Sequence, residues 1–233
     1  MGGSQSSKRA ELVQQLIRHR VETLDTAQPS KSFQSLFQDT GAVIFNVRRM
    51  GWKLCREGAA QLMLAGPDIE LKGARLIAIA KERLGHEEFL KDHWNKEGGM
   101  KDKWLLESDQ TKKDQEEKRD AFTHPELYYD TWKGSELPGT NPLFRVTNGD
   151  SMGLSGVMSY LFNGVVAKSN ARVETKKIKG DMKGEGKILG SVLVINRHGD
   201  VLLHHKEQSW GDHPDDEALY AAINQLDVAN SSL

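Results

Sequence analysis

The chain has 233 residues, of which 37% are hydrophobic and 28% are charged, values typical of a soluble globular domain and unlike those of a fibrous or wholly disordered protein. Its formal net charge of -1 at pH 7 argues against a nucleic-acid partner, because such binders usually carry an excess of basic residues. The single cysteine, Cys55, excludes an intramolecular disulfide and favours a reducing, cytoplasmic setting.

Residues 1–9 are expected to form a flexible tail with a lipidation signal. The first six, Met-Gly-Gly-Ser-Gln-Ser, fit the M-G-x-x-x-[ST] pattern and predict N-myristoylation at Gly2. Lys8 and Arg9 follow, where they could contact anionic lipid headgroups, while a plain Gly/Ser-rich tail is the alternative interpretation. One acyl chain holds a membrane only reversibly. No apolar run approaches the roughly 20 residues that cross a bilayer, so we expect neither a membrane-spanning nor a secreted protein.

Residues 10–40 are expected to form N-terminal helices. From Ala10 to about Thr26, apolar residues recur at the spacing of an amphipathic helix, and Pro29 follows its predicted end. Phe33, Leu36 and Phe37 predict a second short helix.

The next segment predicts the core of the fold. Residues 41–47 are apolar and β-branched and predict a buried strand, 52–64 a helix, and 73–80 a second strand. Two strands joined through a helix are normally parallel, so the fold class is α/β. Residues 85–94 predict another helix.

A charged insertion is expected over residues 96–123, where lysines alternate with acidic residues. Within it, Trp104, Leu105 and Leu106 form an apolar triplet that we predict to dock a protein partner. The alternative is that the segment packs as a short amphipathic helix on its own domain.

The C-terminal part predicts the remaining elements. A short strand is expected over residues 126–130 and a helix around 158–162. Residues 188–196 and 200–205 predict a β-hairpin, and 212–226 a final helix before the tail 229–233. The order of elements over residues 41–228 predicts a thioredoxin-like domain, with a central mixed sheet flanked by helices.

Three segments carry a recognisable pattern. Residues 41–59 contain paired arginines, a glycine and one cysteine followed by Arg-Glu, residues 180–190 are rich in glycine, and residues 204–213 include the last predicted strand and its loop. Together they resemble the peroxiredoxin-like 2 family, a branch of the AhpC/TSA-type thioredoxin fold that includes prostamide/prostaglandin F synthase. The family has a C-x-x-C pair in the first segment. The resemblance therefore implies a degenerate motif, with Trp52 at the first cysteine and Cys55 at the second.

Dithiol chemistry needs a thiolate at a helix N-terminus and a second thiol three residues later. Because Trp52 occupies the attacking position, a dithiol-disulfide cycle within this chain is excluded. Cys55 is either a small buried apolar residue or a one-cysteine thiol activated by Arg48, Arg49 or Arg56, oxidised to a sulfenic acid and recycled by an outside thiol. Trp52 is expected to be a lid on the pocket or an interface anchor.

Other chemistry has less support. His204 and His205 are neighbours that a strand would point to opposite faces, so we expect no metal site near the terminal hairpin. Serine hydrolysis lacks a base at motif spacing. We expect no cofactor, and the lysines between residues 176 and 187 are expected to lie in a solvated loop.

Two functions remain open. The first is a redox-silent or weakly redox-active thioredoxin-like protein that serves as a binding or structural subunit of a larger assembly. The alternative is a one-cysteine thioredoxin- or peroxiredoxin-like oxidoreductase that uses Cys55, of the antioxidant or prostaglandin-endoperoxide reductase type that the resemblance allows. The missing thiol and the available attachment surfaces favour the first. We expect it to be cytoplasmic, with a peripheral membrane or cytoskeletal association as further settings.

Overall fold

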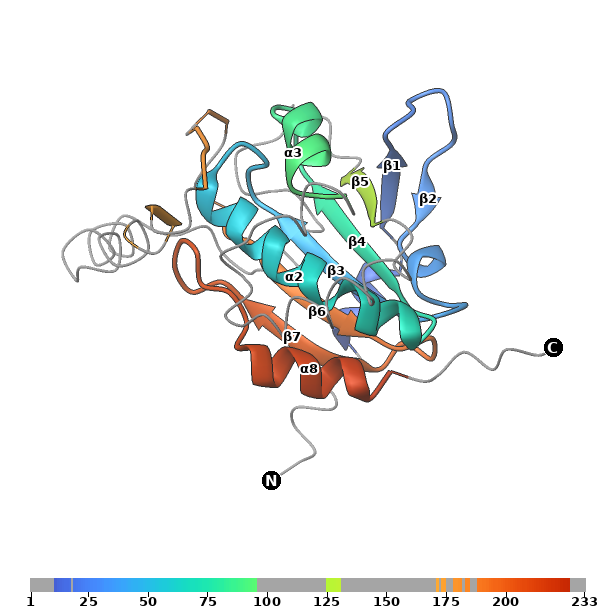
Figure 1. Ribbon diagram of the computed structural model, residues 1–233. Coiled ribbons are helices and arrows are strands. Elements are labelled where there is room, and N and C mark those ends of the chain that lie inside the picture. Colours follow the sequence, from blue (N-terminus) through green and yellow to red (C-terminus); the bar gives the residue numbers. More distant parts are fainter. Residues whose placement is uncertain are drawn as a thin grey trace.

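The computed structural model describes residues 11–17, 19–95, 125–130, 171, 173–174, 178–181, 183–184 and 188–226. These residues form a seven-stranded mixed sheet in the order β2-β1-β5-β4-β3-β6-β7 (Figure 1). The strands are β1 (Arg20–Thr23), β2 (Lys31–Ser32), β3 (Ala42–Val47), β4 (Arg75–Ala80), β5 (Glu126–Asp130), β6 (Ser191–Ile195) and β7 (Val201–Lys206). The helices are the 3-10 helix η1 (Gln34–Leu36) and the α-helices α2 (Lys53–Leu71), α3 (His86–Asp92) and α8 (Asp216–Asn224).

The centre of the sheet has the thioredoxin-like arrangement that the sequence predicts. β3 and β4 are parallel and are joined through α2, and β5 continues the parallel set beside β4. On the other side of β3, β6 is antiparallel, and β7 is antiparallel to β6. The expected fold class, an α/β fold with a mixed sheet and flanking helices, is confirmed.

Side chains alternate between two cores, one on each face of the sheet. Val43 and Phe45 of β3 pack into the core beneath α2, α3 and α8. Ala42 and Ile44, from the same strand, face the opposite core, which the N-terminal residues complete. Because side chains of a strand point alternately to its two faces, a strand buried on both sides is apolar throughout, as residues 42–45 are.

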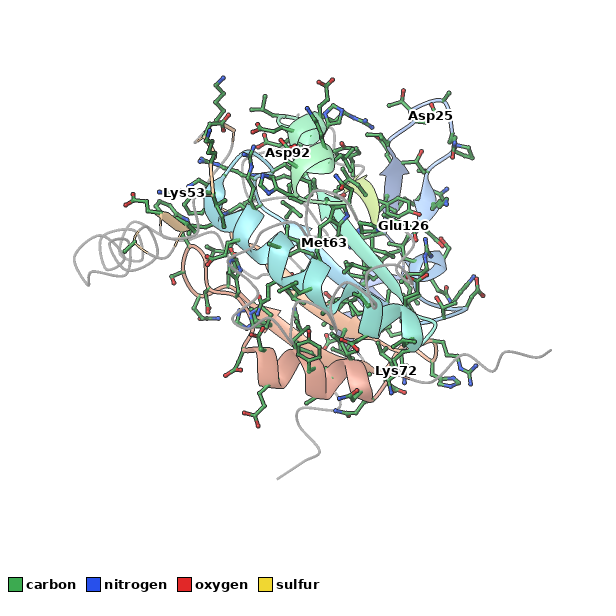
Figure 2. All side chains as sticks on the ribbon, in the orientation of Figure 1. Asp25, Lys53, Met63, Lys72, Asp92 and Glu126 are labelled. Atoms are coloured by element: carbon green, nitrogen blue, oxygen red, sulfur yellow. The ribbon has the colours of Figure 1, made fainter. Side chains whose placement is uncertain are left out.

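Helix α2 crosses the front of the sheet in Figure 1. It begins at Lys53 and continues to Leu71, seven residues beyond the predicted end at Leu64 (Figure 2). Pro67 lies inside its last turns and is buried. At the C-terminal end, the Lys72 ammonium donates a hydrogen bond to the Asn224 carbonyl of α8 at 3.1 Å, which joins the two helices.

The prediction of N-terminal helices over residues 10–40 is wrong for most of that region. Residues 11–16 are helical, but residues 20–23 and 31–32 pair as the antiparallel strands β1 and β2. The turn between them is organised by Asp25, whose carboxylate accepts a hydrogen bond from the Ala27 backbone amide at 2.9 Å. Strand β1 also pairs with β5, a contact between distant parts of the chain that outweighs the local helical spacing.

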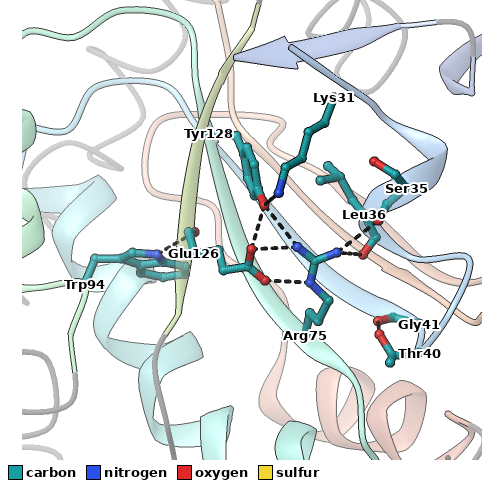
Figure 3. A network of polar contacts seen from close by, with 9 residues as sticks. All are labelled: Lys31, Ser35, Leu36, Thr40, Gly41, Arg75, Trp94, Glu126 and Tyr128. Atoms are coloured by element: carbon teal, nitrogen blue, oxygen red, sulfur yellow. Dashed lines mark hydrogen bonds and ion pairs between the residues drawn. The ribbon is translucent and has the colours of Figure 1, made fainter. Parts of the chain in front are cut away.

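A polar network attaches the N-terminal region to the sheet (Figure 3). The Arg75 guanidinium donates to both carboxylate oxygens of Glu126, at 2.5 and 2.6 Å. The same guanidinium donates to the carbonyls of Ser35 and Leu36, each at 3.0 Å. Tyr128 completes the network by donating its hydroxyl hydrogen to Glu126 at 2.6 Å. Arg75 therefore links β4, β5 and η1 at one point.

Several predictions fall outside the described residues. They are the tail with Gly2, the insertion with Trp104, Leu105 and Leu106, the helix around 158–162, and the C-terminal tail. Within the described ranges, no helix has the length and apolar character needed to cross a membrane.

Candidate functional site

The candidate site lies where β3 ends and α2 begins. Trp52 is the residue immediately before the helix, with extended backbone angles and no side-chain capping hydrogen bond. The first backbone hydrogen bond of α2 runs from the Arg56 amide to the Trp52 carbonyl oxygen, at 3.0 Å. This is the position at which a thioredoxin-type thiolate would gain from the positive end of the helix dipole. Here that position holds an indole ring.

Three side chains stack over this helix end, and we call them the Trp52–Arg48–Trp210 stack. The Arg48 guanidinium carbon lies 3.8 Å from the centre of the Trp52 ring and 5.5 Å from the centre of the Trp210 ring. The two indoles meet edge to face, with ring centres 5.6 Å apart. Trp52 is 6% exposed and Arg48 is 2% exposed. A cation held between aromatic faces away from water is bound strongly, so the stack is a packed unit.

Cys55 is buried in the same hydrophobic cluster as Trp52, with 2% of its surface exposed. Burial raises the pKa of the Cys55 thiol, because a thiolate is poorly solvated there. The Arg48 charge opposes this rise, and hydrogen bonds to the sulfur from the Arg48 side chain and the Arg49 backbone act in the same sense. Burial outweighs them, so the neutral thiol is the favoured form.

A buried carboxyl group, Glu207, completes the cluster. Its side chain is 5% exposed, and its Oε2 accepts a hydrogen bond from the Gly190 backbone amide at 2.6 Å. Burial raises the pKa of Glu207 to about 7, and it outweighs the Arg48 charge and the Gly190 amide, which both lower it. Glu207 in turn raises the pKa of Cys55. Two acidic groups therefore share one buried arginine.

The three arginines proposed from the sequence occupy different places. The Arg48 side chain contacts the Cys55 sulfur and the Trp52 ring, and the Arg49 backbone amide donates a hydrogen bond to the same sulfur. Arg56 is 1% exposed and points elsewhere, donating to the carbonyls of Met50 at 3.1 Å and Lys179 at 2.8 Å. It also pairs with Glu88 of α3 at 2.8 Å. Arg56 therefore holds three segments together.

The glycine-rich segment that precedes β6 packs directly on the start of α2. The Asp181 amide donates to the Gly51 carbonyl at 2.8 Å. A Cβ on Gly180 would lie 2.5 Å from the Lys53 nitrogen and 2.6 Å from the Gly51 oxygen, so only glycine fits at this approach. The close contact of two backbones is the physical reason for a glycine here.

Two histidines near the terminal hairpin, His205 and His213, have partners other than the thiol. His213 packs on α2 at Gly58, and its Nε2 lies 3.8 Å from a Glu57 carboxylate oxygen. His205 contacts Asp212, with its Nε2 2.9 Å from the backbone oxygen. In the part of the chain that the structure describes, no group of three or more His, Cys, Asp or Glu side chains could hold a metal ion.

Two members of the cluster were not predicted from the sequence. Glu207 and Trp210 lie in a segment that carries the family resemblance, but nothing local marks them as neighbours of residues 48–55. No clear local signal was available, because Glu207 follows the polar residues His204, His205 and Lys206 at the end of β7 and is nevertheless buried.

Comparisons with known proteins give consistent relatives. The chain is 27% identical to peroxiredoxin-like 2A of Danio rerio, over 89% of this chain and 79% of the relative. It is 26% identical to peroxiredoxin-like 2A of Mus musculus, over 88% and 76% respectively. It is 27% identical to the prostamide/prostaglandin F synthase of Salmo salar, over 84% and 80%. No family model matches the chain, and no solved structure matches it significantly.

Proposed function

We propose that the chain, which is similar over most of its length to peroxiredoxin-like 2A proteins, is a redox-silent or weakly redox-active thioredoxin-like protein that acts as a binding or structural subunit. One observation carries the proposal. The attacking position at the start of α2 holds Trp52, which is 6% exposed and stacked with Arg48 and Trp210. An indole cannot attack a disulfide or a peroxide, so the first step of dithiol chemistry has no nucleophile at this position.

The alternative is a one-cysteine oxidoreductase that uses Cys55. Hydrogen bonds from Arg48 and Arg49 to the sulfur favour this function, because they stabilise a thiolate. Its substrate class would be a peroxide or, by analogy with the synthase relatives, a prostaglandin-type endoperoxide. Two features weigh against it: the 2% exposure of Cys55 limits access, and burial raises its pKa. Reactive cysteines are usually partly exposed and have lowered pKa values.

Thiol titration of the folded protein tests the choice. The chain has one cysteine, so any reaction with a chromogenic disulfide reports on Cys55 alone. We expect the native protein at neutral pH to react at least roughly 100-fold more slowly than the same protein in urea, since the thiol is buried and protonated. Reaction of the native protein as fast as the unfolded one would contradict the redox-silent proposal and favour the oxidoreductase.

A peroxide treatment gives an independent readout. After exposure to hydrogen peroxide, a sulfenic-acid trapping reagent and intact-mass analysis should find Cys55 unmodified in the native state. Cys55→Ser is the matched control for non-specific labelling. Rapid formation of the trapped adduct in the native wild type, absent from the control, would support the one-cysteine alternative.

We propose a protein partner and an attachment site from the sequence alone. The apolar triplet Trp104, Leu105 and Leu106 is the proposed docking point, and an acyl group on Gly2 would add reversible attachment of the assembly to a membrane in the cytoplasm, while a cytoskeletal association would depend on the docked partner. Replacement of the triplet by serines should abolish co-purification with the native assembly without lowering the melting temperature. A lower melting temperature with intact co-purification would instead assign the triplet to local packing.

A further inference from the structure

The buried carboxyl group of Glu207 has few partners that would stabilise its ionised form. Within the described residues, the Gly190 amide at 2.6 Å is the one hydrogen-bond donor to its carboxylate. An ionised carboxylate can accept about four hydrogen bonds, and a buried one usually needs several or a close cation. The fit is also tight, because a Cβ on Gly190 would lie 3.1 Å from the Glu207 carboxyl carbon. Ionised Glu207 is therefore costly in this position.

The charged groups that face Glu207 come from several elements. Arg48, from the loop between β3 and α2, supplies positive charge, and Asp212, from the loop between β7 and α8, supplies negative charge. Cys55 approaches from α2. His205 of β7 lies beside Asp212, with its Nε2 3.7 Å from a carboxylate oxygen. Arg48 is the one cation among the groups that act on Glu207, and it lies against the Trp52 ring.

The same loop carries Glu207 and the outer ring of the stack. Trp210 follows Glu207 by three residues, and Gly211 next to it has a positive φ of 76° and packs on Leu54 of α2. A movement of this loop that brings water to the carboxylate would also separate Trp210 from Arg48. We therefore expect solvation of the acid and opening of the stack to be coupled.

We propose that ionisation of Glu207 opens the Trp52–Arg48–Trp210 stack and gives solvent access to Cys55, so that the stack acts as a pH-dependent gate. Protonated Glu207 keeps the gate closed, because a neutral carboxyl group tolerates burial with one amide donor. The open form remains a minor state. The gate does not depend on the redox silence proposed above, since it concerns access to the thiol and not turnover.

The direction of the pH effect follows from linkage. In the closed form the pKa of Glu207 is about 7, raised mainly by burial. In a solvated open form the pKa returns toward the ordinary value for glutamate. The closed form thus binds the proton more tightly, so acid favours closure and rising pH favours opening. The opening equilibrium should increase until about pH 7 and then level off.

The test is the rate at which dithiodipyridine, a reagent that also works in mild acid, labels Cys55. The native rate is divided by the rate of the same protein in urea at each pH, which cancels the ionisation of the thiol itself. We expect this ratio to rise roughly tenfold between about pH 5.5 and about pH 7.5. A ratio that is constant or falls over this range would overturn the gate.

Single substitutions distinguish the contribution of Glu207 to the pH dependence from the contributions of its neighbours. Glu207→Gln should stay slow and lose the pH dependence, although removal of a negative charge beside Cys55 would by itself make the thiol more reactive. Asp212→Asn and His205→Gln should retain the rise. Persistence of the rise in Glu207→Gln, or its loss only in His205→Gln, would contradict the assignment to Glu207. If Glu207→Gln does not fold, the wild-type ratio alone decides the proposal.

Discussion

Arg48 is the residue on which the candidate site depends. It is 2% exposed, stacks on Trp52 at 3.8 Å, hydrogen-bonds the sulfur of Cys55 and acts electrostatically on Glu207. A lysine could not replace it without loss, because the planar guanidinium combines ring stacking with directed hydrogen bonds. The arginine thus holds an aromatic pair and two acidic groups together.

Replacement of Arg48 should destabilise the protein. In Arg48→Met the length of the side chain is retained, but Glu207 is left buried without its cation. Because the pKa of Glu207 is already about 7, the carboxyl group can protonate when the cation is lost, and most of the cost comes from the lost ring contacts. We expect a loss of about 1–3 kcal/mol in the free energy of unfolding, larger at pH 8 than at pH 6, measured by urea denaturation. The double variant Arg48→Met/Glu207→Gln should recover part of this loss, since it removes both charges. Additive effects of the two substitutions would show that the groups are not coupled.

Glu207 should also make stability depend on pH. Its pKa in the folded state, about 7, lies above the ordinary value of a glutamate, so the folded protein binds the proton more tightly than the unfolded chain. Its contribution is therefore fully present in acid and is lost as pH rises toward 7. The unfolding free energy of wild type minus that of Glu207→Gln should fall by roughly 2–3 kcal/mol between about pH 4.5 and about pH 7. A difference that rises with pH would contradict the assignment.

At the scale of elements, the sequence predicted the central strands and helices because their signals are local. The apolar run at residues 42–47 and the helical spacing after Trp52 are recognisable without the rest of the chain. Strand β1 could not be recognised in this way, because Val21 and Leu24 fit helical spacing. Its pairing with β5 joins residues about a hundred positions apart. Asp25, which caps the turn, was the available sign of a hairpin.

The candidate site was also predictable only where its residues are close in the sequence. Trp52, Cys55 and the arginines follow one another along a single loop and helix start, so a motif could identify them. Glu207 joins them only through the order of strands in the sheet, because β7 lies two strands away from β3. That placement depends on tertiary structure, which no local pattern encodes.

The glycine-rich segment before β6 should be intolerant of larger residues where it touches α2. In Gly180→Ala, the added carbon would meet backbone atoms of Lys53 and Gly51, which cannot rotate away. We expect a loss of about 1–3 kcal/mol in unfolding free energy, seen as a lower melting temperature. In the control Gly51→Ala, the nearest atom is a carboxylate oxygen of Asp181, a side chain that can move, so the loss should be smaller. Equal losses would argue against the backbone contact.

At the scale of the whole molecule, the N-terminal region closes the second face of the sheet. Phe33 and Leu36 are fully buried against Ile44 and Ile77, while the other face is covered by α2, α3 and α8. The Arg75 network fixes the approach of η1 to β4 and β5. The sheet is thus covered on both sides, as a strand set with apolar residues on both faces requires.

Loss of the Arg75 network should destabilise the packing of η1 and the residues around it on the sheet, and leave the central strands largely unaffected. Arg75→Met removes the donors to the carbonyls of Ser35 and Leu36 and leaves Glu126 without its partner. Hydrogen exchange of amides in residues 33–41 should accelerate at least roughly tenfold, while exchange in β3 changes little. Arg83→Met, which removes an ion pair with Glu22 and hydrogen bonds to the carbonyls of Thr23 and Leu24, is the control and should leave exchange in residues 33–41 unchanged. Uniform acceleration throughout the sheet would instead indicate global destabilisation.

Trp52 at the attacking position should leave the protein without dithiol chemistry. The most direct measurement is disulfide reduction in a dithiol-dependent turnover assay, comparing wild type, Trp52→Cys and Trp52→Cys/Cys55→Ser. We predict no turnover by wild type, measurable turnover by Trp52→Cys, because the substitution places a thiol at the helix N-terminus, and none by the double variant. Turnover by the wild type, or equal turnover by Trp52→Cys and the double variant, would contradict this expectation.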